Sequence, residues 1–151
     1  MDEQFKSKVV VSRGIRNNNP SNIKISSDRW QGQVPPCDAK DKTFCQFYGI
    51  DFGIRALLVL LSNYIVKGYN TPRKIIARFA PSSENHTENY TRFVMSYIND
   101  GVLEQSFSPD DFVERYSFTF FKLCAAICYY ESEYKLTYTH YKNIINHFHL
   151  N

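Results

Sequence analysis

Hydrophobic residues recur at helical spacing along most of this chain. The segment from Asp51 to Gly68 places its apolar residues on one face of a 3.6-residue repeat, at Ile54, Leu57, Leu58, Leu61 and Ile65. An acidic residue at its start and a glycine at its end are typical helix boundaries. This pattern predicts a long amphipathic helix.

A second, shorter helix follows at once in TPRKIIARFAP. Thr71 can cap its first turn, and Pro72 falls at the first helical position, where its missing N–H costs nothing. Pro81 then stops the helix.

The second half of the chain predicts more helix. One helix is expected from about Thr87 to Gly101, and one or two more in the segment 108–133, with Ser108 as the cap. The tail 138–150 also has helical spacing. The segment 43–50, TFCQFYGI, alternates aromatic residues and predicts a short strand or an extended turn. We therefore predict an all-α fold with at most a short β element.

Composition supports one domain of ordinary globular type. The chain has 151 residues, of which 43% are hydrophobic and 16% aromatic, enough for a single core. The formal net charge is +3, and Lys and Arg are scattered, so we expect no nucleic-acid partner. The N-terminus lacks the apolar run of a signal peptide and no segment could span a bilayer. We expect a protein made in the cytoplasm without a signal peptide.

Four cysteines, Cys37, Cys45, Cys124 and Cys128, show no CxxC spacing. The last two are four residues apart on an apolar helix, where free thiols pack as small hydrophobes. We predict core thiols, with no metal site and no cofactor.

The loop RNNNPSNIKISSDRWQG holds three consecutive Asn residues and the chain's single Trp. Its asparagines can form a network of local turns in place of regular structure. They can equally line a cleft, where amides bind hydroxyl and acetamido groups and an indole stacks on a sugar ring. The candidate binding residues are Asn18, Asn19, Asn22 and Trp30.

A second polar segment, APSSENHTENY, opens the helix expected near Thr87. Its Ser and Glu residues are also typical of a simple helix N-terminus. Thr87 and Tyr90, one turn apart, place a hydroxyl and a phenol at the same helix start. We treat His86 as an exposed polar residue, because no sequence partner makes it a ligand or a base.

A third segment, AICYYESEY, carries a carboxyl at the end of an apolar helix. Glu131 lies between Tyr130 and Tyr134, in the partly desolvated setting that a general acid requires. The alternative is that Glu131 and Glu133 only solubilise a helix terminus.

The order of these segments resembles a known family. The strings RGIRNNNPSNI, WQGQ and TPRKIIARFAPSSENHTENYTRFV are similar to small phage and prophage proteins described as virion-associated or lysozyme-like. The resemblance covers roughly residues 13–131. Those relatives usually read NPGNI and HENG, where this chain has Ser21 and YESE.

A more distant resemblance is to peptidoglycan glucosaminidases of the flagellar and autolysin type. In that family a helix ending in a catalytic Glu-Ser precedes an NNxFGIK loop, a WxG and a YATDxxY segment. Here NNPSNIK, WQG and ENHTENY keep that order, but the Glu-Ser helix comes last. The resemblance implies a circularly permuted lysozyme-like domain over 13–151, after an N-terminal extension over 1–12.

The resemblance implies peptidoglycan glycan-strand cleavage of muramidase, glucosaminidase or lytic transglycosylase type. Glu131 would be the catalytic acid, Glu84 the second catalytic candidate, and Thr87 and Tyr90 would line the cleft. The expected partners are glycan strands, with virion components, secretion-machinery components or an immunity protein as further candidates. Action is expected in the periplasm and cell wall or within a virion. The alternative is a virion or secretion-apparatus structural protein that binds glycan without cutting it.

Overall fold

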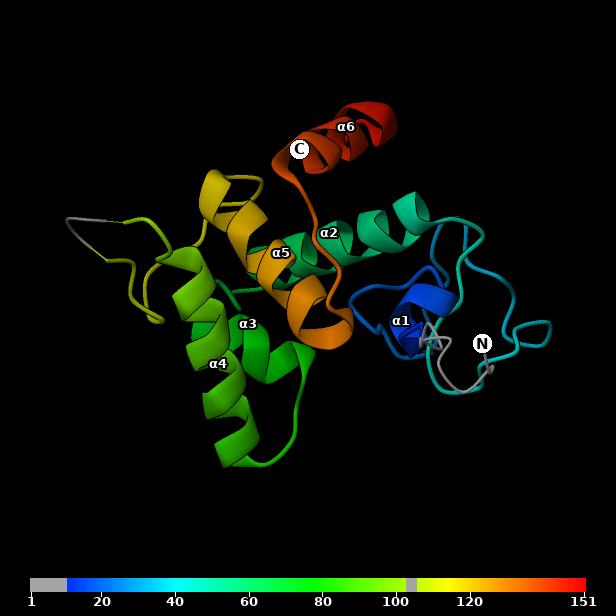
Figure 1. Cartoon of the computed structure of the whole chain (residues 1–151), viewed down its shortest axis with the longest axis horizontal. Helices are drawn as coiled ribbons and strands as arrows, with labels where there is room; N and C mark the ends of the chain where they lie inside the picture. The colour runs from blue at the N-terminus through cyan, green and yellow to red at the C-terminus, as the bar shows by residue number, and fades with distance from the viewer. Residues whose placement is uncertain (1–10, 103–105) are drawn as a thin grey trace, which may run out of the picture.

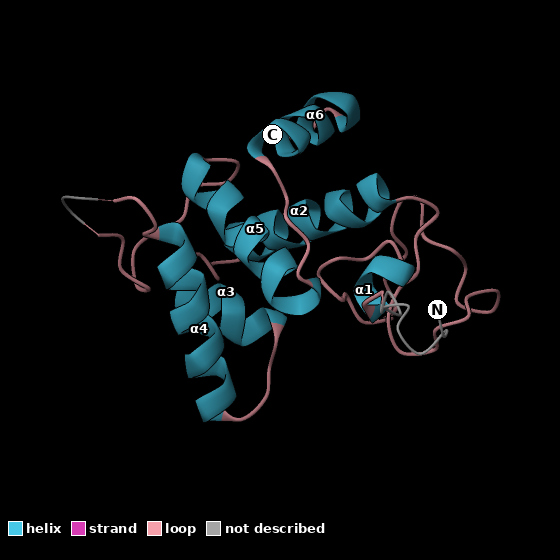
Figure 2. Ribbon diagram, viewed as in Figure 1, coloured by secondary structure: helices cyan, strands magenta, loops and turns pink. Residues whose placement is uncertain are grey.

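The computed structural model describes residues 11–102 and 106–151 and contains six helices over those ranges. Figures 1 and 2 show their arrangement. They are α1 (Arg13–Arg16), α2 (Ile50–Val66), α3 (Pro72–Phe79), α4 (Glu84–Ile98), α5 (Phe118–Ser132) and α6 (Tyr138–Phe148). The predicted all-α single-domain class is confirmed.

The β content of the described residues is limited to two isolated bridges. Lys24 pairs with Phe44, and Gln33 with Phe47, both antiparallel. The segment 43–50 is therefore an extended turn that returns across the Asn-rich loop, one of the two forms predicted for it.

Helix α5 lies at the centre of the fold. Its residues from Leu123 to Cys128 are all buried, as expected of a helix that is apolar all round. Helix α4 packs along it, and α1 contacts it. The last turn of α5 therefore reaches the surface between the N-terminal loop and α4.

The helix boundaries follow their caps. Thr71 accepts a hydrogen bond from the N–H of Lys74 and Pro72 begins α3, as the sequence predicts. Helix α4 begins at Glu84, one turn earlier than Thr87, because the Ser83 hydroxyl caps it by accepting from the N–H of His86.

The predicted cap at Ser108 is wrong. Helix α5 begins at Phe118 and is capped by Ser117. Ser108 lies in a tight turn instead: its N–H donates to the Asp111 carboxylate at 2.7 Å, and its hydroxyl accepts from the N–H of Asp110. Such local side-chain bonds compete with helix formation.

The cysteine prediction holds for the core. Cys45, Cys124 and Cys128 are buried, Cys37 is exposed, and all four are free. Burial raises the pKa of the Cys128 thiol to about 12.

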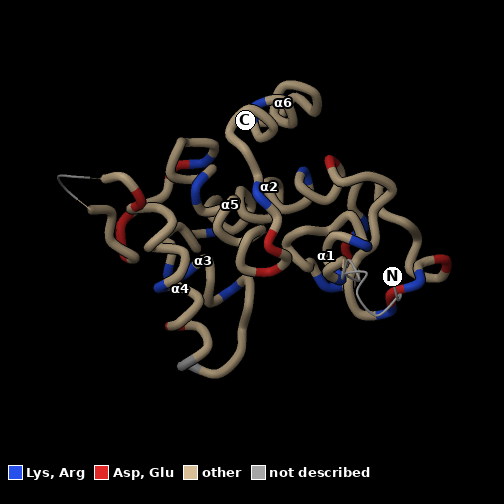
Figure 3. The backbone as a smooth tube through the Cα atoms, viewed as in Figure 1, with Lys and Arg blue, Asp and Glu red and all other residues tan. Residues whose placement is uncertain are grey.

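Charged groups are spread over the molecule. Figure 3 shows Lys and Arg on several helices and loops rather than along a single helix. Within the described residues, no helix is both long and apolar enough to cross a membrane.

Candidate active-site cleft

Glu131 occupies the last turn of α5, at the edge of the core. The helix ends at Ser132, and its C-cap, Glu133, adopts a left-handed conformation with φ 53°. The N–H groups of Glu133 and Tyr134 close the end by donating to the carbonyls of Tyr129 and Cys128, respectively. Ser132 is buried and Glu131 half-buried. The fixed helix end thus presents the Glu131 carboxyl at the surface.

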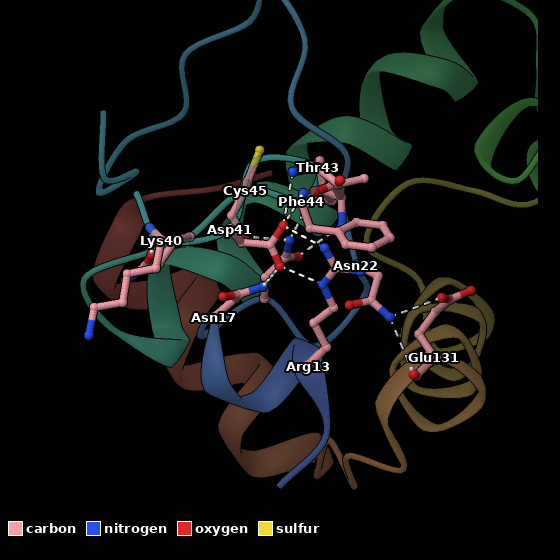
Figure 4. A network of polar contacts seen from close by, with 12 residues as sticks. Arg13, Asn17, Asn22, Lys40, Asp41, Thr43, Phe44, Cys45 and Glu131 are labelled. Carbon is pink, nitrogen blue, oxygen red and sulfur yellow. Dashed lines mark hydrogen bonds and ion pairs between the residues drawn. The ribbon is translucent and has the colours of Figure 1, made fainter. Parts of the chain in front are cut away.

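Two side chains hold the Glu131 carboxyl. The Tyr90 hydroxyl donates to Oε2 at 2.8 Å, and Asn22 Nδ2 donates to Oε1 at 3.2 Å. Asn22 Nδ2 also lies 3.3 Å from the Glu131 backbone carbonyl, as Figure 4 shows. The contact joins two residues 109 positions apart.

Tyr90 is an obligate donor in this arrangement. It is fully buried, and its ring stacks on Tyr130 with centroids 3.8 Å apart. Burial and the neighbouring Glu131 carboxyl both raise the pKa of the Tyr90 hydroxyl well above its usual value. The hydroxyl therefore keeps its proton and orients the carboxyl.

The Asn-rich loop is anchored by Asp41. The carboxylate of Asp41 accepts two hydrogen bonds from Arg13, at 2.6 and 2.8 Å, and one from Asn17 at 2.9 Å. The N–H groups of Thr43 and Phe44 donate to it as well. The Arg13 guanidinium, together with these donors, holds the pKa of Asp41 well below its usual range.

The loop sits against the end of α5. Ser12 Oγ donates to the Ser132 carbonyl at 3.4 Å. A Cβ on Gly14 would collide with Ser132 Oγ and lie 2.9 Å from Asn22 Oδ1. Glycine at position 14 therefore permits the close approach that brings Asn22 to Glu131.

Asn18 and Asn19 hydrogen-bond to backbone groups of their own loop and of the segment 43–50. Asn19 is fully buried, and its Nδ2 donates to the carbonyls of Ile23 and Cys45 while its Oδ1 accepts from the N–H of Ile23. Asn18 has φ 53° and donates to the Phe47 carbonyl at 3.0 Å. These bonds replace the missing ladder of regular structure.

A cleft of about 690 Å³ opens in front of Glu131. One wall is the loop 21–30, the other is formed by the end of α3 and the start of α4, and α2 contributes a third side. The polar and aromatic lining residues include Ser21, Asn22, Trp30, Asn63, Tyr64, Ser82, His86 and Glu131. A cleft of this volume and mixed lining suits a small-molecule or oligosaccharide ligand.

The predicted site residues divide into two groups. Asn22, Trp30 and Glu131 line the cleft together. Tyr90 lies behind Glu131 as its donor, and Thr87 is half-buried on α4, where its carbonyl accepts from Thr91. Asn18 and Asn19 are not part of the lining and shape the loop instead. The prediction for Glu84 falls on a side chain outside the described part of the structure.

Sequence reasoning missed several contributors to the site. His86 is exposed, as expected, but it lines the cleft and places its ring edge-on to Tyr90, with centroids 6.0 Å apart. Asp28 brings a second carboxyl to the lining. Asp41 is not among the predicted site residues. The sequence Asp-Lys-Thr-Phe is nevertheless typical of a turn in which the Asp side chain accepts from the backbone two residues later.

The fold and the cleft define a helical protein in which a tyrosine and an asparagine orient a carboxyl at the wall of a cleft. Among the side chains that the structure describes, no three His, Cys, Asp or Glu residues gather as a metal site requires.

Comparison with known proteins finds a phage relative. Protein P5 of Pseudoalteromonas phage PM2 is 48% identical over 88 residues, which cover 56% of this chain and 54% of the relative. The chain thus spans about half the length of the curated relative that it matches. No protein-family model matches the chain. The chain is homologous to a phage protein, in agreement with the phage part of the resemblance.

Proposed function

We propose that this chain is a lysozyme-like domain that cleaves peptidoglycan glycan strands, with Glu131 as the catalytic acid. The carboxyl would deliver its proton to the glycosidic oxygen as the bond to the anomeric carbon breaks. The observation that carries the proposal is the setting of Glu131: a half-buried carboxyl, oriented by Tyr90 and Asn22, at the wall of a cleft that also holds Trp30.

The positive charge that develops at the sugar needs a partner. Some glycan-cleaving enzymes use the substrate's own N-acetyl group for this, so one enzyme carboxyl suffices. Glu84 is the second carboxyl that the sequence resemblance favours, and Asp28 lines the same cleft. Either can support the reaction by activating water or stabilising the oxocarbenium centre.

The permuted lysozyme-like order is supported by the junction between α5 and α1. The Ser12–Ser132 hydrogen bond joins the end of the Glu131 helix to the start of the Asn-rich loop. In the unpermuted order those two segments follow each other along the chain. Their adjacency in space allows the same site to be built from either connectivity.

Zymography tests the activity. The wild type is expected to clear a gel that contains purified peptidoglycan, and Glu131→Gln is expected not to, because the amide keeps the shape of the carboxyl but has no proton to deliver. Glu84→Gln is the comparison variant. Clearing by Glu131→Gln together with loss of clearing by Glu84→Gln would assign the acid to Glu84.

The tryptophan offers a binding readout independent of cleavage. Trp30 is half-buried at the cleft wall, where a sugar ring can stack on its indole. We expect its fluorescence to change on titration with chitooligosaccharides or muropeptides. Unchanged emission at saturating saccharide would remove the stacking role.

A second candidate function is non-catalytic. The observation that favours it is the YESE ending, which differs from the HENG of the resembling family and so changes the surroundings of Glu131. A virion component that binds glycan without cutting it is also compatible with the relative's phage origin. A wild type that binds muropeptides through Trp30 and never clears peptidoglycan would establish this function instead.

A further inference from the structure

Four cationic side chains surround the cleft in front of Glu131. Lys24 and Arg29 lie on the Asn-rich loop side, Lys67 at the end of α2 and Arg78 in the last turn of α3. Among the described side chains, two carboxyls, Asp28 and Glu131, share the lining. Cations therefore outnumber carboxyls among the described residues of this surface.

These cations are not committed to ion pairs elsewhere. In the part of the chain that the structure describes, the ion pairs involve Arg13, Arg73 and His140, all outside the cleft. Over the same ranges Lys24 and Lys67 make no side-chain hydrogen bond and both are exposed. Their charges are available to a ligand.

The two arginines are held in place by the protein. Arg29 donates to the carbonyls of Ser26 and Asp28 at 2.7 and 2.9 Å. Arg78 lies over the Tyr69 ring at 4.7 Å and near Tyr64 at 5.9 Å. An arginine that is already oriented loses less freedom when it binds an anion.

We propose that the cleft selects glycan strands that carry carboxylates over neutral glycans of the same length. The carboxylates belong to the lactyl ether of muramic acid or to the peptide stem, and Lys24 and Lys67 contact them as the strand lies across Glu131. This proposal rests on the proposed glycan-binding function of the same cleft. It adds that charge, and not only sugar shape, determines which strands bind.

The lining argues against a nucleic acid as the anionic ligand. A phosphate backbone needs cations along a continuous track, whereas here Asp28 and Glu131 interrupt them. The Asn22 amide and the Trp30 indole suit an acetamido sugar. In a strand of alternating glucosamine and muramic acid, only the muramic acid units bear carboxylates, so the negative charges are widely spaced.

Binding to Glu131→Gln protein, which cannot turn over its ligand, tests the selectivity. Titration calorimetry would compare three saccharides of equal length: a chitooligosaccharide, a glycan of alternating glucosamine and muramic acid without peptides, and the same glycan with peptide stems. We expect the carboxylate-bearing strands to bind about fivefold or more tighter at low salt, and the advantage to shrink in high salt. The two carboxylate-bearing strands separate the lactyl from the peptide source.

Two matched double variants assign the effect. Lys24→Gln with Lys67→Gln removes two cleft charges, and Lys135→Gln with Lys142→Gln removes two exposed charges elsewhere. The first pair is expected to weaken the preference clearly, although Arg29 and Arg78 remain in the lining, and the second pair to leave it intact. The proposal would be overturned if Glu131→Gln protein with all its lysines bound neutral and carboxylate-bearing strands equally well. It would also be overturned if this protein bound a DNA oligonucleotide more tightly than the carboxylate-bearing strands. Failure to clear peptidoglycan would instead contradict cleavage and leave the selectivity standing.

Discussion

Two carboxyls lie on either side of the Asn-rich loop, and the structure treats them differently. Asp41 accepts five hydrogen bonds, two of them from Arg13, and its side chain is 8% exposed. Glu131 accepts from Asn22 and Tyr90 and faces a cleft. Figure 4 shows both groups within one field of view.

On the proposed function, the difference separates a carboxyl that holds the structure together from one that takes part in catalysis. Every lone pair of Asp41 has a donor, so a ligand has nothing to bind there, and the group serves to close the loop. Glu131 is oriented by two neutral donors and keeps capacity for a third partner. The number of hydrogen bonds that a carboxyl already accepts therefore indicates its role better than its position near a polar loop does.

Substitution of Glu131 has the largest expected effect on activity. Glu131→Gln should lower the rate of soluble glycan-strand cleavage by roughly a hundredfold or more, because general-acid catalysis is lost. The Tm should change little, because the Gln oxygen can still accept from Asn22, while the Tyr90 hydroxyl, which can accept as well as donate, can take the amide N–H. A large fall in Tm with retained turnover would place Glu131 in the structural class beside Asp41.

Asp41→Asn should show the opposite behaviour. The amide has no charge for Arg13 and points a donor at Arg13 or Asn17, so we expect a loss of about 2 kcal/mol in the free energy of unfolding. Chemical denaturation measures it, with the exposed Asp38→Asn as the control. If Asp41→Asn matched Asp38→Asn in stability, the loop would not depend on the carboxylate.

The stability of the protein at acid pH should also depend on Asp41. The pKa of Asp41 is lowered in the folded state, so the unfolded chain binds the proton more readily. Stability from this group is complete above the unfolded pKa of about 4 and is lost as pH falls below it. Between pH 6 and pH 3, the free energy of unfolding should fall more steeply for the wild type than for Asp41→Asn, as measured by chemical denaturation at each pH. Parallel pH profiles for the two proteins would count against this role of Asp41.

Tyr90→Phe has the smallest expected effect. The ring can still stack on Tyr130, but Oε2 of Glu131 loses its donor. We expect turnover to fall about tenfold, the size expected when one hydrogen bond that orients the acid is lost. Tyr97→Phe, half-buried on the same helix, is the control. Equal rates for the two variants would show that Glu131 needs no orienting hydroxyl.

The sequence predicted helices well where cap and periodicity agreed. Thr71 with Pro72 defined α3, and the apolar face defined α2. It failed at Ser108, because the Ser-Pro-Asp-Asp pattern suits both a helix cap and a tight turn. Local residues alone do not decide between these two outcomes.

For the cleft, the family resemblance predicted one site that contains Asn22, Trp30 and Glu131, and these three share a lining. The same predicted site also included Asn18, Asn19, Glu84, Thr87 and Tyr90. The sequence could not separate Asn22 from Asn19, because both stand in the same polar run. Their difference depends on partners far along the chain: the Cys45 carbonyl for Asn19 and Glu131 for Asn22. Asp41 escaped notice for the same reason, since Arg13 lies 28 residues before it.

The contact between Asn22 and Glu131 spans 109 residues, which has a consequence for synthesis of the protein. At equilibrium, closing so long a loop costs only slightly more free energy than closing one half as long, because the entropy cost grows with the logarithm of loop length. During translation, however, α5 leaves the ribosome long after the Asn-rich loop. A growing chain can hold the tryptophan and the loop but no acid, so on the proposed function an unfinished copy cannot cut glycan.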